Sequence, residues 1–400
     1  MKFLRSFLDK QARHFQKGGK LERLNPVYEA ADTILFSTGK PTLSSPHVRD
    51  VLDMKRAMIT VVYALIPCTL MALYNTGYQA NLALSQIADV QTSFWQTQLM
   101  MQLGVAFDPS NIWANVLHGA LFFLPVYIVT IAVGGFWEVL FAIIRKHEIN
   151  EGFLVTSLLF PLISPPTLPY WQIALGVSFG VVIGKEVFGG VGMNIFNPAL
   201  TARAFLFFAY PAQISGDKVW VAVDGLSQAT ALAQLADPLI EFTFTWKEAF
   251  IGLIPGSMGE TSVIAVLIGA FILIVTKIGS WRIMLSTLIG LIGTALFFNW
   301  VGSETNPMFE VSPWMHLVFG GYAFGAVFMA TDPVSATMTT QGKWIYGLFI
   351  GILVIMVRVI NPAFPEGMML AILFMNVFSP IIDRIFINRN IKRRQLRHAE

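Results

Sequence analysis

Apolar runs separated by short polar stretches follow one another along almost the whole chain. Ten runs can be distinguished, near residues 57–77, 112–144, 152–164, 168–184, 198–210, 262–276, 283–300, 314–330, 344–360 and 367–385. A straight transmembrane helix needs about 20 predominantly apolar residues, and several of these runs are shorter. The pattern predicts an all-α integral membrane domain over residues 57–385, with about ten transmembrane helices, some broken into half-helices.

The basic residues predict an orientation for these helices. Eleven Lys and Arg occur up to Arg56, and six occur from Arg384 to Arg397. Because cytoplasmic flanks are enriched in Lys and Arg, both termini should be cytoplasmic and the number of spans even. Ten spans also place Arg145, Lys146, Lys185, Lys277, Arg282 and Lys343 on the inner side. We expect a multi-pass protein of a bacterial inner membrane, with a cytoplasmic segment 1–56, an outer loop 211–261 and a basic tail 386–400.

The first residues form a separate pattern. Basic and apolar side chains interleave over 2–17, and Gly18-Gly19 follow. This spacing predicts a basic amphipathic helix. Two interpretations stay open: the helix lies on a membrane face, or it packs on a partner as an ordinary solvated helix.

Two apolar runs begin or end at an Asx-Pro pair. The stretches are NIFNPALTARAF (194–205) and FMATDPVSATM (328–338). Proline interrupts a membrane helix, and freed backbone groups are tolerated there only where they face protein, water or a ligand. Paired breaks indicate a buried site between two halves, here of five spans each in an inverted repeat. Asn194, Asn197 and Asp332 could line a midplane site for a flat hydrogen-bonding ligand, or they could cap the broken helices.

Composition limits the chemistry. The chain is 55% hydrophobic and 13% charged, which excludes a single water-soluble domain. Cys68 is the only cysteine, so there is no internal disulfide and no cysteine-ligated zinc or iron–sulfur site. The formal charge of +3 gives no indication of a nucleic-acid partner. His118 and His316 near outer span ends raise bis-histidine haem ligation, but no other residue supports it.

A polar turn stands out in the outer loop. Residues 223–235 read VDGLSQATALAQL. The plain interpretation is an Asp224-Gly225 turn and a short helix capped by Ser227. The second interpretation comes from a resemblance.

Asp-Gly-x-Ser-x-Ala-Thr resembles the acceptor motif for covalent FMN in the B subunit of the Na⁺-translocating NADH:quinone oxidoreductase. Further similar stretches cover the chain: SSPHVRD, VGGFWEVLFAIIRKHEINEGF, PPTLPYWQIALG, GKEVFGG, RAFLFFAYPAQISGD, IPGSMGE and VINPAFPEGMMLAILF. The chain is identified as a member of the NqrB/RnfD family. The resemblance implies that a flavin transferase joins FMN through its phosphate to Thr230, within the motif Asp224, Gly225, Ser227 and Ala229. Gln228 stands where the family usually has Gly.

The resemblance also implies roles for residues inside the membrane. Gly134 and Gly135 would bind quinone, although two glycines also suit helix packing. The sodium pathway would include Glu138, Asp383 and Glu29. For Glu138 the alternative is an ion pair with Arg145 or Lys146, and for Asp383 a pair with Arg384. Noncovalent riboflavin would occupy the site of Asn194, Asn197 and Asp332.

The implied function is that of a membrane redox subunit in a six-subunit sodium pump. Electrons from NADH would pass through flavins of this chain to ubiquinone, coupled to Na⁺ export. The sequence has no glycine fingerprint for NADH, so partner subunits A, C, D, E and F would supply the missing steps. Two alternatives stay open: the D subunit of the Rnf electron-transport complex, and a urea-transporter-like solute channel, whose broken helices and repeat are similar.

Overall fold

The computed structural model describes residues 2–15, 19–36, 54–87, 92–146, 149, 152–216, 218–223, 229–237, 239, 242–361 and 367–399. Helices account for the regular structure throughout these residues, and no strand occurs among them. The predicted all-α class is therefore confirmed.

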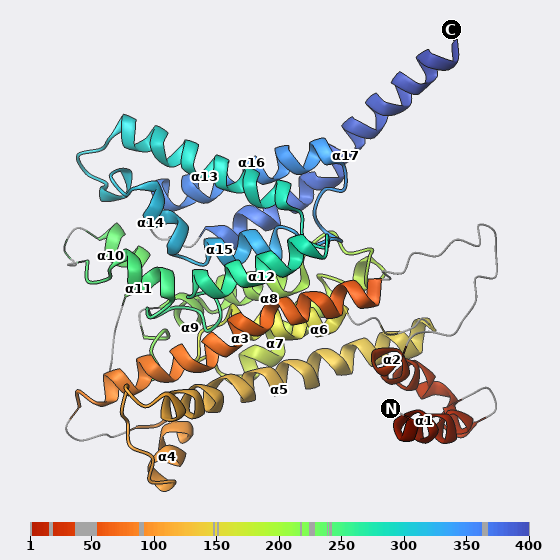
Figure 1. Ribbon diagram of the computed structural model, residues 1–400, viewed down its shortest axis with the longest axis horizontal. Helices are drawn as coiled ribbons and strands as arrows, with labels where there is room; N and C mark the ends of the chain where they lie inside the picture. Colours follow the sequence, from red (N-terminus) through yellow and green to blue (C-terminus); the bar gives the residue numbers. More distant parts are fainter. Residues whose placement is uncertain are drawn as a thin grey trace.

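Among the described residues, six helical segments are long and apolar enough to cross a membrane. They are Arg56–Leu84 in α3 (Met54–Leu84), Ile112–Arg145 (α5), Tyr170–Phe188 (α7, Tyr170–Val182, with the turn η2, Glu186–Phe188), Trp281–Val301 (α13), Thr340–Ile360 (α16) and Met368–Arg397 in α17 (Met368–Ala399). They run roughly along one direction (Figure 1). At about 1.5 Å per residue, the 34 residues of α5 span about 51 Å, more than the hydrocarbon core, so α5 projects beyond it or tilts.

The remaining apolar runs form shorter pieces. Three further apolar helices have 11 to 13 residues: α6 (Gly152–Leu162), α8 (Pro198–Ala209) and α12 (Val263–Val275). The run predicted over 314–330 is divided into α14 (Pro313–Val318), α15 (Tyr322–Phe324) and a π-helical turn, η4 (Gly325–Met329). Several of the predicted apolar runs therefore form short or divided helices.

Small helices lie at the two ends of this bundle. At one end (Figure 1) are α4 (Trp95–Gln102), α9 (Pro211–Ser215), α10 (Ala231–Ala236) and α11 (Trp246–Ile251), and η3 (Pro307–Phe309) contacts α10. The amphipathic α1 (Lys2–Phe15), η1 (Glu22–Leu24) and α2 (Asn25–Leu35) lie beside the opposite end of α5. Both chain termini are at this second end (Figure 1). The described part of the predicted tail, residues 386–399, continues α17 as a helix that projects from the bundle.

Glycines allow the long helices to approach closely. A Cβ on Gly351 of α16 would collide with the Thr287 carbonyl of α13, and one on Gly119 of α5 would collide with backbone of α3. Small residues at such crossings replace the hydrophobic driving force that is missing within lipid. Contacts of α3 with α12 and of α8 with α17 join the first and second parts of the chain.

Candidate functional site

The broken helices enclose a cavity in the half of the bundle nearer the termini. Asn194, Asn197 and Asp332 all line it, so the structure brings the predicted midplane residues together. The lining also includes Lys185, which the sequence analysis did not single out as a site residue. Among the described lining residues, Lys185 and Asp332 are the only charged side chains. The remaining wall is largely apolar and comes from α3, α6, α12 and η4.

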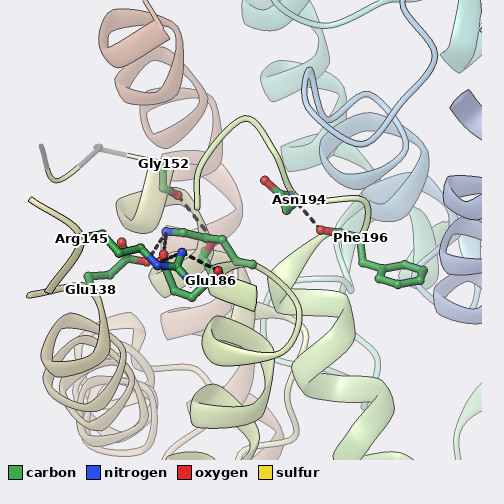
Figure 2. A network of polar contacts seen from close by, with 8 residues as sticks. Glu138, Arg145, Gly152, Glu186, Asn194 and Phe196 are labelled. Carbon is green, nitrogen blue, oxygen red and sulfur yellow. Dashed lines mark hydrogen bonds and ion pairs between the residues drawn. The ribbon is translucent and has the colours of Figure 1, made fainter. Parts of the chain in front are cut away.

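The polar residues of this inner cavity also cap the interrupted helices. Asn197 is the N-cap of α8: its side-chain oxygen accepts from the backbone N–H groups of Ala199 and Leu200 at 3.0 and 3.3 Å. Its amide nitrogen donates to Asp332 at 3.4 Å, across 135 residues of sequence. Asn194 donates to the carbonyl of Phe196 at 2.8 Å (Figure 2). The capping interpretation is therefore correct for Asn197, which lines the cavity as well.

Asp332 receives its hydrogen bonds from neutral groups. The backbone N–H of Val334 donates to it at 3.1 Å and the hydroxyl of Ser335 at 2.9 Å, besides the amide of Asn197. In the part of the chain that the structure describes, no cation forms an ion pair with this carboxylate. Among the described residues, Asp332 therefore faces the cavity without a paired cation.

The inner cavity is small, about 50 Å³. This volume accommodates a few water molecules, whereas sites for small organic ligands usually measure about 300–1,000 Å³. The amide and carboxylate groups suit the polar edge of a flavin ring. The ring itself would fit only after lining residues move apart.

Glu138 belongs to a buried cluster of charges beside this cavity. Its carboxylate contacts the ammonium group of Lys185, and both side chains are about 4% exposed. Glu186 lies 3.7 Å from the same ammonium group and 3.5 Å from the guanidinium of Arg145 (Figure 2). Arg145 also donates to the backbone carbonyl of Glu186 at 2.6 Å. Lys185 comes from the segment after α7, so Glu138 has a basic partner outside its own helix.

The two glycines of α5 have different surroundings. Gly134 is buried, and a Cβ there would collide with the ring of Phe153 on α6. Gly135 is half-buried, and a Cβ would meet the same ring only at an ordinary 3.8 Å. Close packing against Phe153 therefore explains why residue 134 is a glycine. The same packing does not require a glycine at position 135, so Gly135 can have another role.

Asp383 and Glu29 come from elements that contribute no other residue to the Glu138 cluster. Asp383 of α17 accepts hydrogen bonds from the backbone N–H of Met338 at 2.7 Å and of Thr339 at 3.0 Å, and from the Thr339 hydroxyl at 2.6 Å. These contacts anchor the beginning of α16, in place of the pair with Arg384 that the sequence suggested. Glu29 is half-buried on α2, which contacts α5.

A second cavity, about 40 Å³, lies at the end of the bundle far from the termini. Thr230, Glu260, Gly320 and Gly321 are among its lining residues. Thr230 is half-buried and is itself the N-cap of α10, because its hydroxyl oxygen accepts from the N–H of Ala233 at 3.3 Å. Of the predicted acceptor motif, Ala229 and Thr230 are described, whereas Asp224, Gly225, Ser227 and Gln228 lie outside the described residues.

Two buried arginines, which were not predicted as site residues, contact the lining of this second, outer cavity. Arg203 of α8 forms an ion pair with Glu260 at 3.3 Å. Arg358 of α16 is fully buried and donates to the backbone carbonyls of His316, Phe319 and Gly320 at 2.7, 2.9 and 3.2 Å. It thereby fixes the irregular backbone between α14 and α15, where buried carbonyl groups would otherwise lack a donor. Charge within an apolar run was the available signal for both arginines.

His118 has no free ring nitrogen for a haem. Its Nδ1 lies 2.8 Å from the amide oxygen of Asn81, and its Nε2 lies 3.2 Å from the hydroxyl of Thr97. The Asn81 amide nitrogen donates to Asn115 at 2.8 Å, so its oxygen accepts from His118. Within the described residues no group of three or more His, Cys, Asp or Glu could hold a metal ion.

These features define an all-helical membrane protein in which interrupted helices enclose an inner and an outer polar cavity. A family model described as "NQR2, RnfD, RnfE family" matches residues 42–392. The chain belongs to this family, which confirms the expected resemblance.

Relatives of known name align over almost the whole chain. The B subunit of the Na(+)-translocating NADH-quinone reductase of Ectopseudomonas mendocina (strain ymp) is 57% identical over 402 residues, covering 99% of this chain and 100% of the relative. Proteins of the same name from Chromohalobacter salexigens and Yersinia pestis are 55% and 54% identical, covering 99% and 98% of this chain and 97% and 99% of themselves. This full-length similarity confirms the expectation that the chain is a component of an enzyme complex.

Proposed function

We propose that this chain is a membrane redox subunit of a Na⁺-translocating NADH:ubiquinone oxidoreductase and carries FMN on Thr230. The names of the relatives support the complex, and they favour it over the Rnf D subunit and over a solute channel. The observation that carries the flavin assignment is the position of Thr230. It is half-buried at the rim of the outer cavity, at the end of the bundle opposite the termini (Figure 1, α10).

The surroundings of Thr230 suit an anchored flavin. The side chain needs no large shift to be esterified, because it caps a six-residue helix at the surface and its oxygen acts only as an acceptor there. A phosphoester at this oxygen holds the cofactor at one point, and the flavin then supplies one- and two-electron chemistry. Glu260 and the glycine backbone of 320–321 offer polar groups at the cavity wall.

Thr230→Ala tests this assignment. We expect the variant to assemble and to lose one FMN from its intact mass and from in-gel fluorescence. Thr245→Ala is the matched control, because Thr245 is likewise an N-cap threonine of a short helix, α11, at this end of the bundle. A Thr230→Ala protein that still carries the flavin mass would refute the attachment site.

The inner cavity is the proposed place of noncovalent riboflavin, held by Asn194, Asn197 and Asp332. The amide and carboxylate groups of these residues can hydrogen-bond the polar edge of riboflavin, and the cavity must widen to admit the flavin ring. We place ubiquinone beside Gly135, on the half-exposed side of α5. Maturation requires a flavin transferase that reaches the loop containing Thr230.

Na⁺ is proposed to bind the carboxylate of Glu138, with Glu29 at the entrance to the pathway. Na⁺ prefers hard oxygen ligands such as carboxylate. A buried carboxylate within a membrane helix costs free energy, which makes Glu138 a candidate for a functional role. The contacts of Asp383 favour an anchoring role, so we do not extend the pathway to it.

The proposed topology is ten membrane segments in two inverted groups of five. The six long helices, the three short ones and the broken segment 313–329 supply the ten. Both termini lie at one end of the bundle, as an even number requires. Because this end carries the basic termini, we assign it to the cytoplasm of a bacterial cell, with the inner membrane as the proposed site of the complex. The other five subunits would bring NADH and iron–sulfur chemistry.

A further inference from the structure

We propose that the end of α17 beyond Asp383 docks against an acidic surface of another subunit of the complex, on the cytoplasmic side. Residues 384–397 are called the projecting segment below. This inference rests on the proposed membership of the sodium-translocating complex, and it does not depend on the flavin, quinone or sodium sites. It adds an interaction surface and the chemical character of the partner that covers it.

The beginning of the projecting segment can be located relative to the membrane. Asp383 accepts a hydrogen bond from the backbone N–H of Thr339, so it lies level with the first turn of α16. In the same region Trp344 of α16 packs edge to face against Trp281, the first residue of α13. Tryptophans at the ends of membrane helices are typical of the boundary between lipid and water. The chain therefore leaves the hydrocarbon near Arg384.

No other described element of the chain covers the projecting segment. Every side chain from Ile387 to Arg397 is exposed. Within the part of the chain that the structure describes, no salt bridge includes a cation of this segment. The cytoplasmic helices α1 and α2 lie on the opposite side of the bundle from it (Figure 1). The segment therefore presents its full circumference to a partner.

The cations of the projecting segment lie mainly on one side of the helix. Four of them are spaced i, i+3, i+4 and i+8, positions that share one side. These four form the basic face: Arg389, Lys392, Arg393 and Arg397. Like charges one turn apart, as in Arg393 and Arg397, repel one another and destabilise a helix. A row of carboxylates along the basic face would remove this repulsion.

The reach of the projecting segment favours a protein partner over lipid headgroups. At about 1.5 Å per residue, Arg397 lies about 20 Å along the helix from Arg384. The headgroup region extends only about 5–8 Å beyond the hydrocarbon core on each side. Lipid phosphates can therefore reach Arg389, whereas residues 392–397 extend past them. The segment cannot turn to lie flat on the membrane, because it continues α17 as one helix.

The side chains of the basic face indicate an acidic protein surface as the occupant. Three of its four cations are arginines, whose guanidinium groups bind carboxylates through two parallel hydrogen bonds. Leu396 lies among them on the same face and is exposed, so it supplies an apolar contact at the centre of the interface. The matching surface carries Asp and Glu around a small apolar patch.

The test uses the purified, assembled complex with the photo-reactive amino acid p-benzoylphenylalanine in place of Leu396. Irradiation joins this side chain covalently to the molecule that covers the basic face, and mass spectrometry identifies the product. We expect capture of one other subunit, at a stretch rich in Asp and Glu. The same replacement at Ile391 is the control and should give little product. At about 100° per residue, Ile391 lies roughly 140° around the helix from Leu396.

Two neighbouring charge reversals form a matched pair. Arg393→Glu and Arg394→Glu both replace an exposed arginine and change the net charge equally, but only Arg393 belongs to the basic face. Arg393→Glu should lower cross-linking from Leu396 by at least about fivefold, because it sets like charges against each other. Arg394→Glu should leave it nearly unchanged. Helix unfolding would not explain the loss, since the carboxylate would stand one turn from Arg389 and Arg397.

Each result decides a separate question. If the unaltered chain purifies without any other subunit, the proposed complex is refuted, and this inference with it. If the complex assembles but Leu396 captures no subunit, or captures phospholipid, nucleic acid or a second copy of this chain, the inference alone is refuted. Equal losses in Arg393→Glu and Arg394→Glu would also refute it, because they would show a response to net charge only. Failure of Arg393→Glu alone to assemble would support the docking face.

Discussion

The amide of Asn197 donates to the carboxylate of Asp332 at 3.4 Å and thereby joins the two interrupted membrane segments. Each residue stands directly before a proline, Asn197 at the beginning of α8 and Asp332 after η4. Proline removes a backbone donor at each break, so side chains have to satisfy the exposed backbone groups. Asn197 caps α8, and Asp332 accepts hydrogen bonds from Val334 and Ser335 in the turn that follows it. The two side chains also connect the segments and line the inner cavity.

Asn197→Asp tests the hydrogen bond to Asp332 separately from the N-cap of α8. Aspartate caps a helix as well as asparagine does, so only the contact with Asp332 changes, from a hydrogen bond to repulsion between carboxylates. We expect a loss of about 1–3 kcal/mol in stability, measured as a lower midpoint of thermal unfolding. Asn111→Asp, at the exposed N-cap of α5, is the control and should have little effect. Equal behaviour of the two variants would show that the connection contributes nothing.

Gly135→Leu is expected to impair quinone reduction. The residue is half-buried and a side chain meets only an ordinary contact, so the protein should fold. Ubiquinol formation should slow by more than about tenfold, because added bulk displaces the quinone ring, while flavin reduction by NADH stays near its normal rate. Stopped-flow absorbance separates the two steps.

Gly134→Leu is the comparison for this experiment, and it should reduce assembly because of Phe153. If Gly135→Leu slows flavin reduction and quinone reduction equally, Gly135 is a packing residue and the quinone assignment fails.

Asp383→Asn should lower stability and leave Na⁺ binding unchanged. The carboxylate accepts three hydrogen bonds at the beginning of α16, and an amide has only one oxygen to accept them. The lost hydrogen bond is exposed at Met338 or half-buried at Thr339, so its loss costs about 0.5–1.5 kcal/mol. Thermal unfolding measures this loss, and a Na⁺ titration of the same sample gives half-saturation. A shift of half-saturation comparable to that of Glu138→Gln would restore Asp383 to the sodium pathway.

Several features of the candidate sites could be predicted locally. Asn197 and Asp332 were identified because a proline beside an Asx residue interrupts an apolar run, and that signal lies within a few positions. Thr230 was identified from its motif, although the expected cap of the short helix was Ser227. The helix begins one turn later, and Thr230 is its N-cap. Such shifts are common because several hydroxyl residues in succession can all serve as caps.

The sequence by itself determined the class of this protein: an all-helical membrane chain with interrupted helices and basic ends. Hydropathy, proline positions and charge are properties of short stretches, so they can be read without the fold. Only the tertiary structure decided which side chains meet. Lys185 reaches Glu138 across 47 residues, and Arg358 reaches the backbone of 316–320 from another helix. These pairings depend on which helix faces are in contact, and the near-uniform apolarity of membrane helices leaves that choice to close packing and buried polar groups.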